Sequence, residues 1–128
     1  MTEAQEHKQV VDYIKLQYPK VIFNTDMSGI KLTIGQAKKA AQLRSKHKFP
    51  DLVIYHSNSL YHGLFIELKK TGEKIYKKDG NFKTEHLKDQ VNTLIALHDN
   101  GYCAQLARGF NHAKAIIDDY MNIPKLKR

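Results

Sequence analysis

The sequence predicts an α/β fold with a mixed central β-sheet flanked by helices. Segments whose apolar residues recur at helical spacing alternate with short runs of β-branched and aromatic residues, in the order helix, strand, helix, hairpin, helix, strand, helix. Elements that alternate in this way pack as layers around one sheet. The chain has 128 residues, about one domain, so we expect a single domain over residues 1–128.

Residues 2 to about 18 predict the first helix. Thr2 can be its N-cap, Gln5 completes a capping box, and Pro19 lies just past its end. The expected apolar stripe consists of Val10, Val11, Ile14 and Tyr18.

Two glutamates lie in the first turns of this helix. On a helical projection Glu3 falls close to the axis of the apolar stripe and Glu6 falls well to its side, so we expect Glu3 to point toward the core side. An acidic residue in the first turn also stabilises the helix dipole without any further role.

A short strand and a second helix are predicted next. Val21, Ile22 and Phe23 form the strand, and residues 24–29 form a loop in which Asn24 is a typical turn former. The helix is expected from about Thr33 to Lys48.

A hairpin of two strands occupies the middle of the chain. Its strands are residues 49–55 and 64–69, and the Ser-Asn-Ser sequence between them is typical of turns. Side chains alternate along a strand, so Glu67 and Lys69 share one face, and Asp51 opens the first strand where it can face the same pair.

Three ionisable groups in so apolar a region need a reason, since burying an unpaired charge is unfavourable. A divalent cation between Asp51 and Glu67 is one such reason. Mg²⁺ binds one or two carboxylates, keeps several waters and leaves room for phosphate oxygens. Lys69 is not a ligand while protonated, but it can polarise a water or balance negative charge.

Pro50-Asp51 followed by Glu67-Leu68-Lys69 resembles the PD-(D/E)-x-K nuclease motif. The order of an early Glu-Ala-Gln, a Pro-Asp-Leu, a Phe-Ile-Glu-Leu-Lys and a downstream glutamine is similar to the VRR-NUC branch of that superfamily, the virus-type replication-repair nuclease domain. The resemblance covers nearly the whole chain. It implies a restriction-endonuclease-like core.

The resemblance also implies roles for particular residues. Asp51, Glu67, the main-chain carbonyl of Leu68 and the early glutamate would hold Mg²⁺ or Mn²⁺, with Glu3 matched to that glutamate and Glu6 as the alternative. Lys69 would act in catalysis. Gln90 is the sole glutamine of the helix that is predicted to begin at Thr84. By this resemblance it would orient water or Lys69.

Members of this branch resemble phage and bacterial proteins that act on branched DNA, such as Holliday junctions, in replication, repair or recombination. They commonly form homodimers. We therefore expect DNA as the partner, with a homodimer and a helicase or repair protein as further expectations. The expected location is the cytoplasm of a bacterial cell or of a phage-infected host.

The charge of the chain also favours a polyanionic partner. Lysine and arginine number 21 against 13 acidic residues, which gives a formal charge of +8. The predicted second helix contains five cations and no acid, and we interpret it as the surface that follows phosphates, with a merely solvated face as the alternative. These cations are Lys38, Lys39, Arg44, Lys46 and Lys48.

Residues 70–83 form a long polar loop, which is either a binding loop or a solvated one. Its candidate phosphate contacts are Lys70, Lys77 and Lys78, and Tyr76 is a candidate to stack on an unpaired base. A helix capped by Thr84 is expected to reach about Asn100.

The last two elements are a strand over residues 102–107 and a helix capped by Asn111 that ends near Asn122. The single cysteine, Cys103, rules out an internal disulfide and is expected to be buried. No segment is apolar and long enough for a membrane span, and no signal-peptide pattern is present.

Other chemistries are disfavoured by the residues. Seven histidines are scattered without a zinc-binding spacing, and neither a Gly-x-Ser-x-Gly elbow nor a phosphate-binding Gly-Lys-Ser/Thr loop is found. The sequence thus predicts a metal-dependent nuclease, with a non-catalytic nucleic-acid-binding module of the same fold as the alternative. A protein-interaction subunit is a third and more remote alternative.

Overall fold

The computed structural model describes residues 1–26 and 33–127 of the chain. It contains one four-stranded sheet in which the strands follow one another in chain order. The first three strands are antiparallel and the fourth is parallel to the third, so the sheet is mixed, as predicted. The strands are β1 (Phe23–Thr25), β2 (Leu52–Ile54), β3 (Leu64–Lys69) and β4 (Cys103–Arg108).

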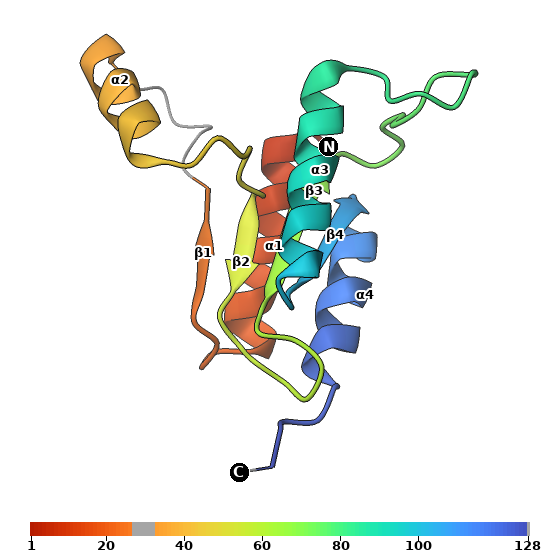
Figure 1. Ribbon diagram of the computed structural model, residues 1–128. Coiled ribbons are helices and arrows are strands. Elements are labelled where there is room, and N and C mark those ends of the chain that lie inside the picture. The colour runs from red at the N-terminus through yellow and green to blue at the C-terminus, as the bar shows by residue number, and fades with distance from the viewer. Residues whose placement is uncertain (27–32, 128) are drawn as a thin grey trace.

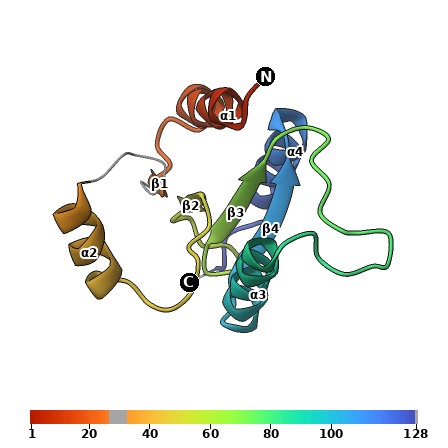
Figure 2. The same cartoon turned by 90° about the horizontal axis from the view of Figure 1, so that it is seen from above.

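Three of the four helices lie against this sheet, and α2 projects from it (Figure 1). Seen from above, α1 and α4 cover one face and α3 crosses the other, while α2 lies on the same side as α3 but beyond β1 (Figure 2). The chain therefore folds in three layers, with helices on both faces of the sheet. The helices are α1 (Glu3–Gln17), α2 (Ile34–Leu43), α3 (Glu85–Asp99) and α4 (Phe110–Met121).

The core lies between β2–β3 and the helix pair α1–α4. The alternation predicted for β3 is observed, because one face of the strand packs on α1 and α4 whereas Glu67 and Lys69 belong to the opposite face. Burying each large aliphatic side chain contributes about 1.5–3 kcal/mol. The most buried residues include Val10, Ile14, Leu64, Ile66, Leu68 and Ile117.

Side-chain caps begin three of the helices. Thr2 and Gln5 form the predicted capping box of α1, and Thr84 accepts from the backbone of Leu87 at the start of α3. A second capping box begins α2 at Thr33. Gly101 follows α3 with a φ of 91°, a conformation that favours glycine at the end of a helix.

Two of the predicted boundaries are wrong near the second helix. The first strand begins at Phe23 and includes Asn24, which is therefore a strand residue paired with Val53 and not a turn former. The rest of the loop predicted to end at residue 29 lies partly outside the described residues. The second helix ends at Leu43 because Arg44 adopts an extended conformation, so residues 44–48 are not helical.

The start of the last helix also differs from the prediction. The N-cap is Gly109, with no side-chain cap of its own, and Asn111 lies inside the helix. The backbone N–H of Phe110 instead donates to a carboxylate from α1, Glu6, at 3.4 Å. A contact between residues more than 100 positions apart thus replaces the local cap.

Helix α2 has no buried residue, and it projects from the rest of the fold (Figure 1). Ile34 and Leu43 at its two ends are 80% and 78% exposed. Local capping, and not packing, holds this helix. Among the described residues, none of the helices is long and apolar enough to cross a bilayer.

Candidate active site

The register of β2 against β3 brings Asp51 to the C-terminal end of the neighbouring strand. Pairing ends at Leu52 opposite Ile66, so the main chain of Leu68 lies beyond the last residue pair. Its N–H donates to Asp51 Oδ2 at 2.7 Å. The N–H and C=O groups of any one strand residue point toward the same neighbouring strand. The Leu68 carbonyl therefore also faces the side on which Asp51 lies.

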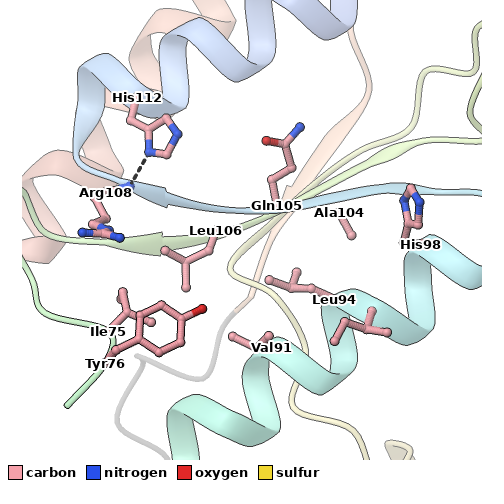
Figure 3. Close-up of a pocket in the computed structure, with 11 residues that line it drawn as sticks. Ile75, Tyr76, Val91, Leu94, His98, Ala104, Gln105, Leu106, Arg108 and His112 are labelled. Atoms are coloured by element: carbon pink, nitrogen blue, oxygen red, sulfur yellow. Dashed lines mark hydrogen bonds between the residues drawn. The ribbon is translucent and has the colours of Figure 1, made fainter. Parts of the chain in front are cut away.

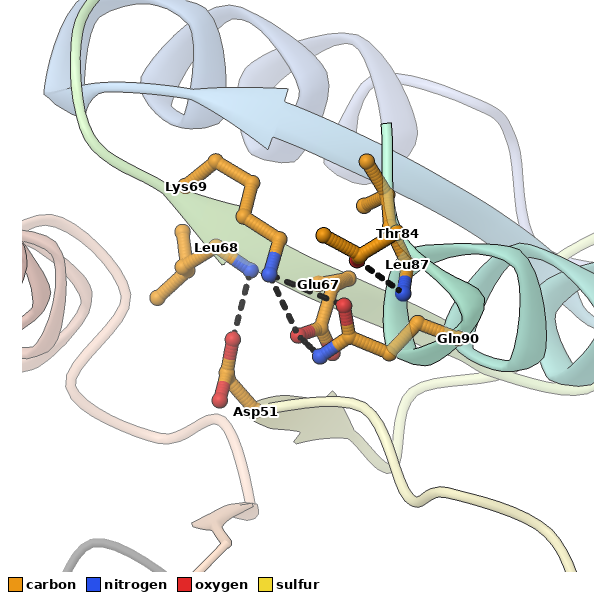
Figure 4. Close-up of polar contacts among 7 residues, drawn as sticks. All are labelled: Asp51, Glu67, Leu68, Lys69, Thr84, Leu87 and Gln90. Carbon is orange, nitrogen blue, oxygen red and sulfur yellow. Dashed lines mark hydrogen bonds and ion pairs between the residues drawn. The ribbon is translucent and has the colours of Figure 1, made fainter. Parts of the chain in front are cut away.

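Glu67, Lys69 and Gln90 form a hydrogen-bonded group beside Asp51 (Figure 4). Gln90 projects from α3, where its Nε2 donates to Glu67 Oε1 at 2.5 Å and its Oε1 accepts from Lys69 Nζ at 2.9 Å. Lys69 Nζ is also 3.7 Å from Glu67 Oε1. The glutamine therefore links the carboxylate to the ammonium group and fixes the position of both.

Burial makes this site electrostatically unusual. Glu67 is only 3% exposed, and desolvation together with the adjacent Asp51 carboxylate raises the pKa of Glu67 to about 8, while Lys69 acts in the opposite direction. Two carboxyl groups this close are stable together when they share a proton or a cation. The site can thus take up positive charge at neutral pH.

The donor set suits a hard divalent cation. In the part of the chain that the structure describes, no three acidic, histidine or cysteine side chains gather around one point. The protein ligands at hand are the carboxylates of Asp51 and Glu67 and the Leu68 carbonyl. Mg²⁺ commonly binds through one or two carboxylates and retains waters, so these residues fit Mg²⁺ or Mn²⁺ better than zinc, which prefers nitrogen and sulfur ligands.

The burial of the two N-terminal glutamates is the reverse of the prediction. Glu6, and not Glu3, is the buried one, because the buried stripe of α1 runs through Glu6, Val10 and Ile14. Val11 and Tyr18 are only half-buried, and their inclusion in the predicted stripe moved its axis toward Glu3. Position in the stripe therefore gave the wrong orientation for these acids.

Glu3 nevertheless lies near enough to Lys69 and Asp51 for their charges to act on it. Partial burial raises the pKa of Glu3, and its charged neighbours are Lys69, which lowers that pKa, and then Asp51, which raises it. It is not close enough to complete a three-carboxylate cluster. Glu3 thus contributes to the field of the site from outside its centre.

The carboxylate of Glu6 accepts hydrogen bonds from Thr71, just after β3, and from Phe110, at the start of α4. Its carboxylate accepts from Thr71 Oγ1 at 2.6 Å and from the Thr71 N–H at 2.9 Å, in addition to Phe110 N–H. These hydrogen bonds hold the pKa of Glu6 below its ordinary value. Thr71 comes two residues after Lys69, so Glu6 anchors the chain just past the end of β3, a role that no local sequence signal indicates.

A hollow of about 300 Å³ adjoins Asp51 on the face of the sheet that carries Glu67. Its lining includes Asn24, Pro50 and Phe65, together with two aromatic side chains that the sequence reasoning did not single out. These are Phe49 and Tyr55, which are 52% and 57% exposed. Large exposed aromatic residues that flank a strand carrying a site acid are the signal that could have identified them.

The predicted phosphate-binding cations are all exposed, but the fold divides them between two places. Five lie on α2 and on the segment that leads from it to Pro50, and three lie after β3 in the 70–83 loop, where Tyr76 stacks on Phe82 with ring centroids 5.2 Å apart. The first group comprises Lys38, Lys39, Arg44, Lys46 and Lys48, and the second comprises Lys70, Lys77 and Lys78.

Comparison with known proteins was informative only at the level of structure. No family model and no curated protein matches the sequence. Among solved structures, a "VRR_NUC domain protein" aligns over 99% of this chain and 93% of its own, with a TM-score of 0.75 and 24% identity. The chain thus has the fold of a VRR_NUC domain protein, as the motif predicted.

Proposed function

We propose that this chain is a metal-dependent nuclease that hydrolyses phosphodiester bonds in DNA. The observation that carries the proposal is the pairing of the Asp51 and Glu67 carboxyl groups beside a lysine whose ammonium is held by Gln90. Glu67 is buried and Asp51 is partly buried, and two carboxylates in such a place lower stability unless a proton or a cation offsets their charge. The shared fold with a VRR_NUC domain protein supports the same conclusion.

Asp51, Glu67 and the Leu68 carbonyl are the residues that would hold Mg²⁺ or Mn²⁺. When bound, such an ion supplies Lewis-acid stabilisation of the phosphoryl oxygens and increases the acidity of a coordinated water. Glu3 adds negative potential from the first turn of α1.

Hydrolysis adds water across a P–O bond, so the water must lose a proton and the leaving oxygen must gain one. Lys69 is placed to offset the negative charge that develops on the phosphoryl oxygens or to position the attacking water. Gln90 keeps the Lys69 side chain beside Glu67, since its Oε1 accepts from Nζ. The amide thereby reduces the number of rotamers available to a flexible lysine.

The preferred substrate in this proposal is branched or structured DNA, with Holliday junctions as one example, in phage or bacterial replication, repair or recombination. The projecting basic helix α2 lies on the same side of the sheet as α3, from which Gln90 reaches the site (Figure 2). Phosphate contacts there would hold a duplex without reading its bases. A homodimer would present two such sites to two strands, and a helicase or repair protein could deliver the enzyme.

The test uses labelled single-stranded, duplex, flapped and four-way DNA, incubated with Mg²⁺, Mn²⁺ or a chelator. Wild-type protein is compared with Glu67→Gln and Asp51→Asn, which keep side-chain volume but remove the ionisable group. Asp119→Asn, an exposed acid on α4, serves as the matched control.

We expect metal-dependent cutting that is lost in both site variants and retained in the control. DNA binding should persist or tighten in the site variants, because they no longer repel phosphate. Binding without cutting on every substrate and metal would instead favour the non-catalytic nucleic-acid-binding module. Cutting that survives Glu67→Gln would show that the Asp51–Glu67 carboxyl pair is not required for cleavage.

A further inference from the structure

Strand β4 is an edge strand with one side open. Among the described residues its only strand neighbour is β3. At the first residue of β4 and just after its last, main-chain N–H groups point toward β3. Cys103 N–H donates to Gly63 O at 2.9 Å, and Gly109 N–H donates to Lys69 O at 2.7 Å. Because these directions alternate along a strand, Ala104 and Leu106 turn their N–H and C=O groups away from β3.

One end of this open edge is already closed by a side chain. The N–H of Arg108, the next residue in the alternation, donates to His112 Nδ1 of α4 at 3.0 Å. Because the imidazole occupies the Arg108 N–H, a further strand cannot pair with that group. The unpaired stretch is limited to the main chain around Ala104 and Leu106.

A groove of about 410 Å³ runs beside these two residues (Figure 3). Its opposite wall is the side of α3 that carries Val91, Leu94 and Ile95, and Tyr76 of the 70–83 loop closes one end. Ile95 and Tyr76 are each 55% exposed, although both are large and apolar. An open strand edge facing an apolar helix is the arrangement in which an extended peptide adds as a further strand.

The only formally charged side chain in the lining of the groove is cationic. It belongs to Arg108, and no aspartate or glutamate contributes to the lining. A partner that enters the groove is therefore favoured if it carries acidic side chains.

We propose that this groove binds an extended, acidic segment of a partner protein, which adds to β4 as a fifth strand. Main-chain groups of Ala104 and Leu106 would pair with the peptide, its apolar side chains would contact Val91 and Ile95, and an acidic side chain would meet Arg108. The site is separate from the proposed catalytic centre, because α3 turns Gln90 toward the carboxylates and Val91 and Ile95 toward the groove.

Two other occupants are disfavoured by the same observations. A second copy of the chain would bring Arg108 from both grooves to a twofold interface, with no acid from either groove to balance the two charges. A nucleic-acid strand would meet mainly aliphatic walls, whereas stacking platforms for bases are aromatic.

The binding test uses the full chain in chelator and without DNA, so that its result does not depend on nuclease activity. The probes are two fluorescent eight-residue peptides of alternating valine and threonine, with two aspartates at the N-terminal end of one and at the C-terminal end of the other. Together they cover both strand directions. Controls replace the aspartates with lysines, or N-methylate every second amide along one edge or the other of the peptide.

We expect saturable binding of at least one aspartate peptide below about 1 mM, weakened at least about tenfold by lysine replacement. N-methylation of one edge should abolish binding and N-methylation of the other should not, because only one edge faces β4. In amide NMR spectra the shifted signals should include Ala104 and Leu106.

Protein variants locate the site. Ala104→Pro removes an N–H that points away from β3, which an edge strand tolerates, and Ile95→Glu adds a charge to an exposed wall. Each should weaken binding at least about tenfold. Leu60→Glu, at a residue 66% exposed in the turn between β2 and β3, is the control and should leave binding unchanged.

Several results would overturn the proposal. These are the absence of saturable binding by either peptide, equal binding of both N-methylated forms, and binding unaffected by Ala104→Pro and Ile95→Glu. Self-association that disappears in Ala104→Pro would assign the edge to a second copy. Shifts of Ala104 and Leu106 by single-stranded DNA, but not by peptide, would assign it to nucleic acid.

Discussion

Gln90 on α3 donates its side-chain amide to the carboxylate of Glu67 on β3 at 2.5 Å, across a layer boundary of the fold. The other end of the same amide holds Lys69. A helix that packs mainly on β4 thus supplies the group that orders two residues of the neighbouring strand.

Replacing Gln90 with leucine should lower the cleavage rate constant by about 10–100-fold while the protein stays folded. The substitution keeps an apolar contact but removes both hydrogen bonds, so the Lys69 ammonium is no longer held beside Glu67. Single-turnover cleavage and circular dichroism measure the two effects. Asn92→Leu, at an exposed position of the same helix, is the control, and equal rates for the two variants would contradict the role of Gln90.

The metal-free protein should become less stable as the pH rises from about 5 to about 8. The pKa of Glu67 is raised from 4.5 to about 8 in the folded state, so between these values the folded protein binds more protons than the unfolded chain does. Stability then falls with increasing pH. Thermal unfolding in chelator checks this, and Glu67→Gln should flatten the dependence.

Adding Mg²⁺ or Mn²⁺ should raise the melting temperature more at pH 8 than at pH 5, because the ion competes with the proton for the same carboxyl pair. The increase should be absent in Glu67→Gln. An equal increase in wild type and variant would place the ion elsewhere.

Glu6→Ala should reduce the free energy of unfolding by about 2–3 kcal/mol, since it removes a buried acceptor of three hydrogen bonds. The pKa of Glu6 is lowered in the folded state, so its contribution is present above its ordinary pKa and is lost as the pH falls below it. Denaturant titrations at neutral and acidic pH measure both. The difference from wild type should shrink at acidic pH, and Glu3→Ala, at an exposed position, should cost much less.

Reversing Lys38, Lys39 and Arg44 to glutamate should weaken DNA binding for all sequences alike. If the three cations each contact a phosphate, the slope of log K against log salt should decrease in magnitude by about 3. The melting temperature should not change, because all three side chains are exposed. The matched control reverses Lys15, Lys20 and Lys125, which are also exposed. An equal loss of binding in both triple variants would indicate only net charge and not a DNA surface on α2.

The sequence by itself determined the layers of the fold and the composition of the candidate site. Alternation along residues 64–69 assigned Glu67 and Lys69 to one face, and local caps such as Thr2 and Thr84 marked the helix starts. These signals depend on spacings of two to four residues. The fold that they predicted is the one observed.

Tertiary structure alone decided the contacts between residues that are distant in the chain. That Asp51 meets the main chain of Leu68 depends on strand register, and that Glu6 caps α4 in place of Asn111 depends on how α1 packs. The open edge of β4 likewise exists because no described strand pairs beyond it. Such features result from long-range packing, which the local periodicity of a sequence does not encode.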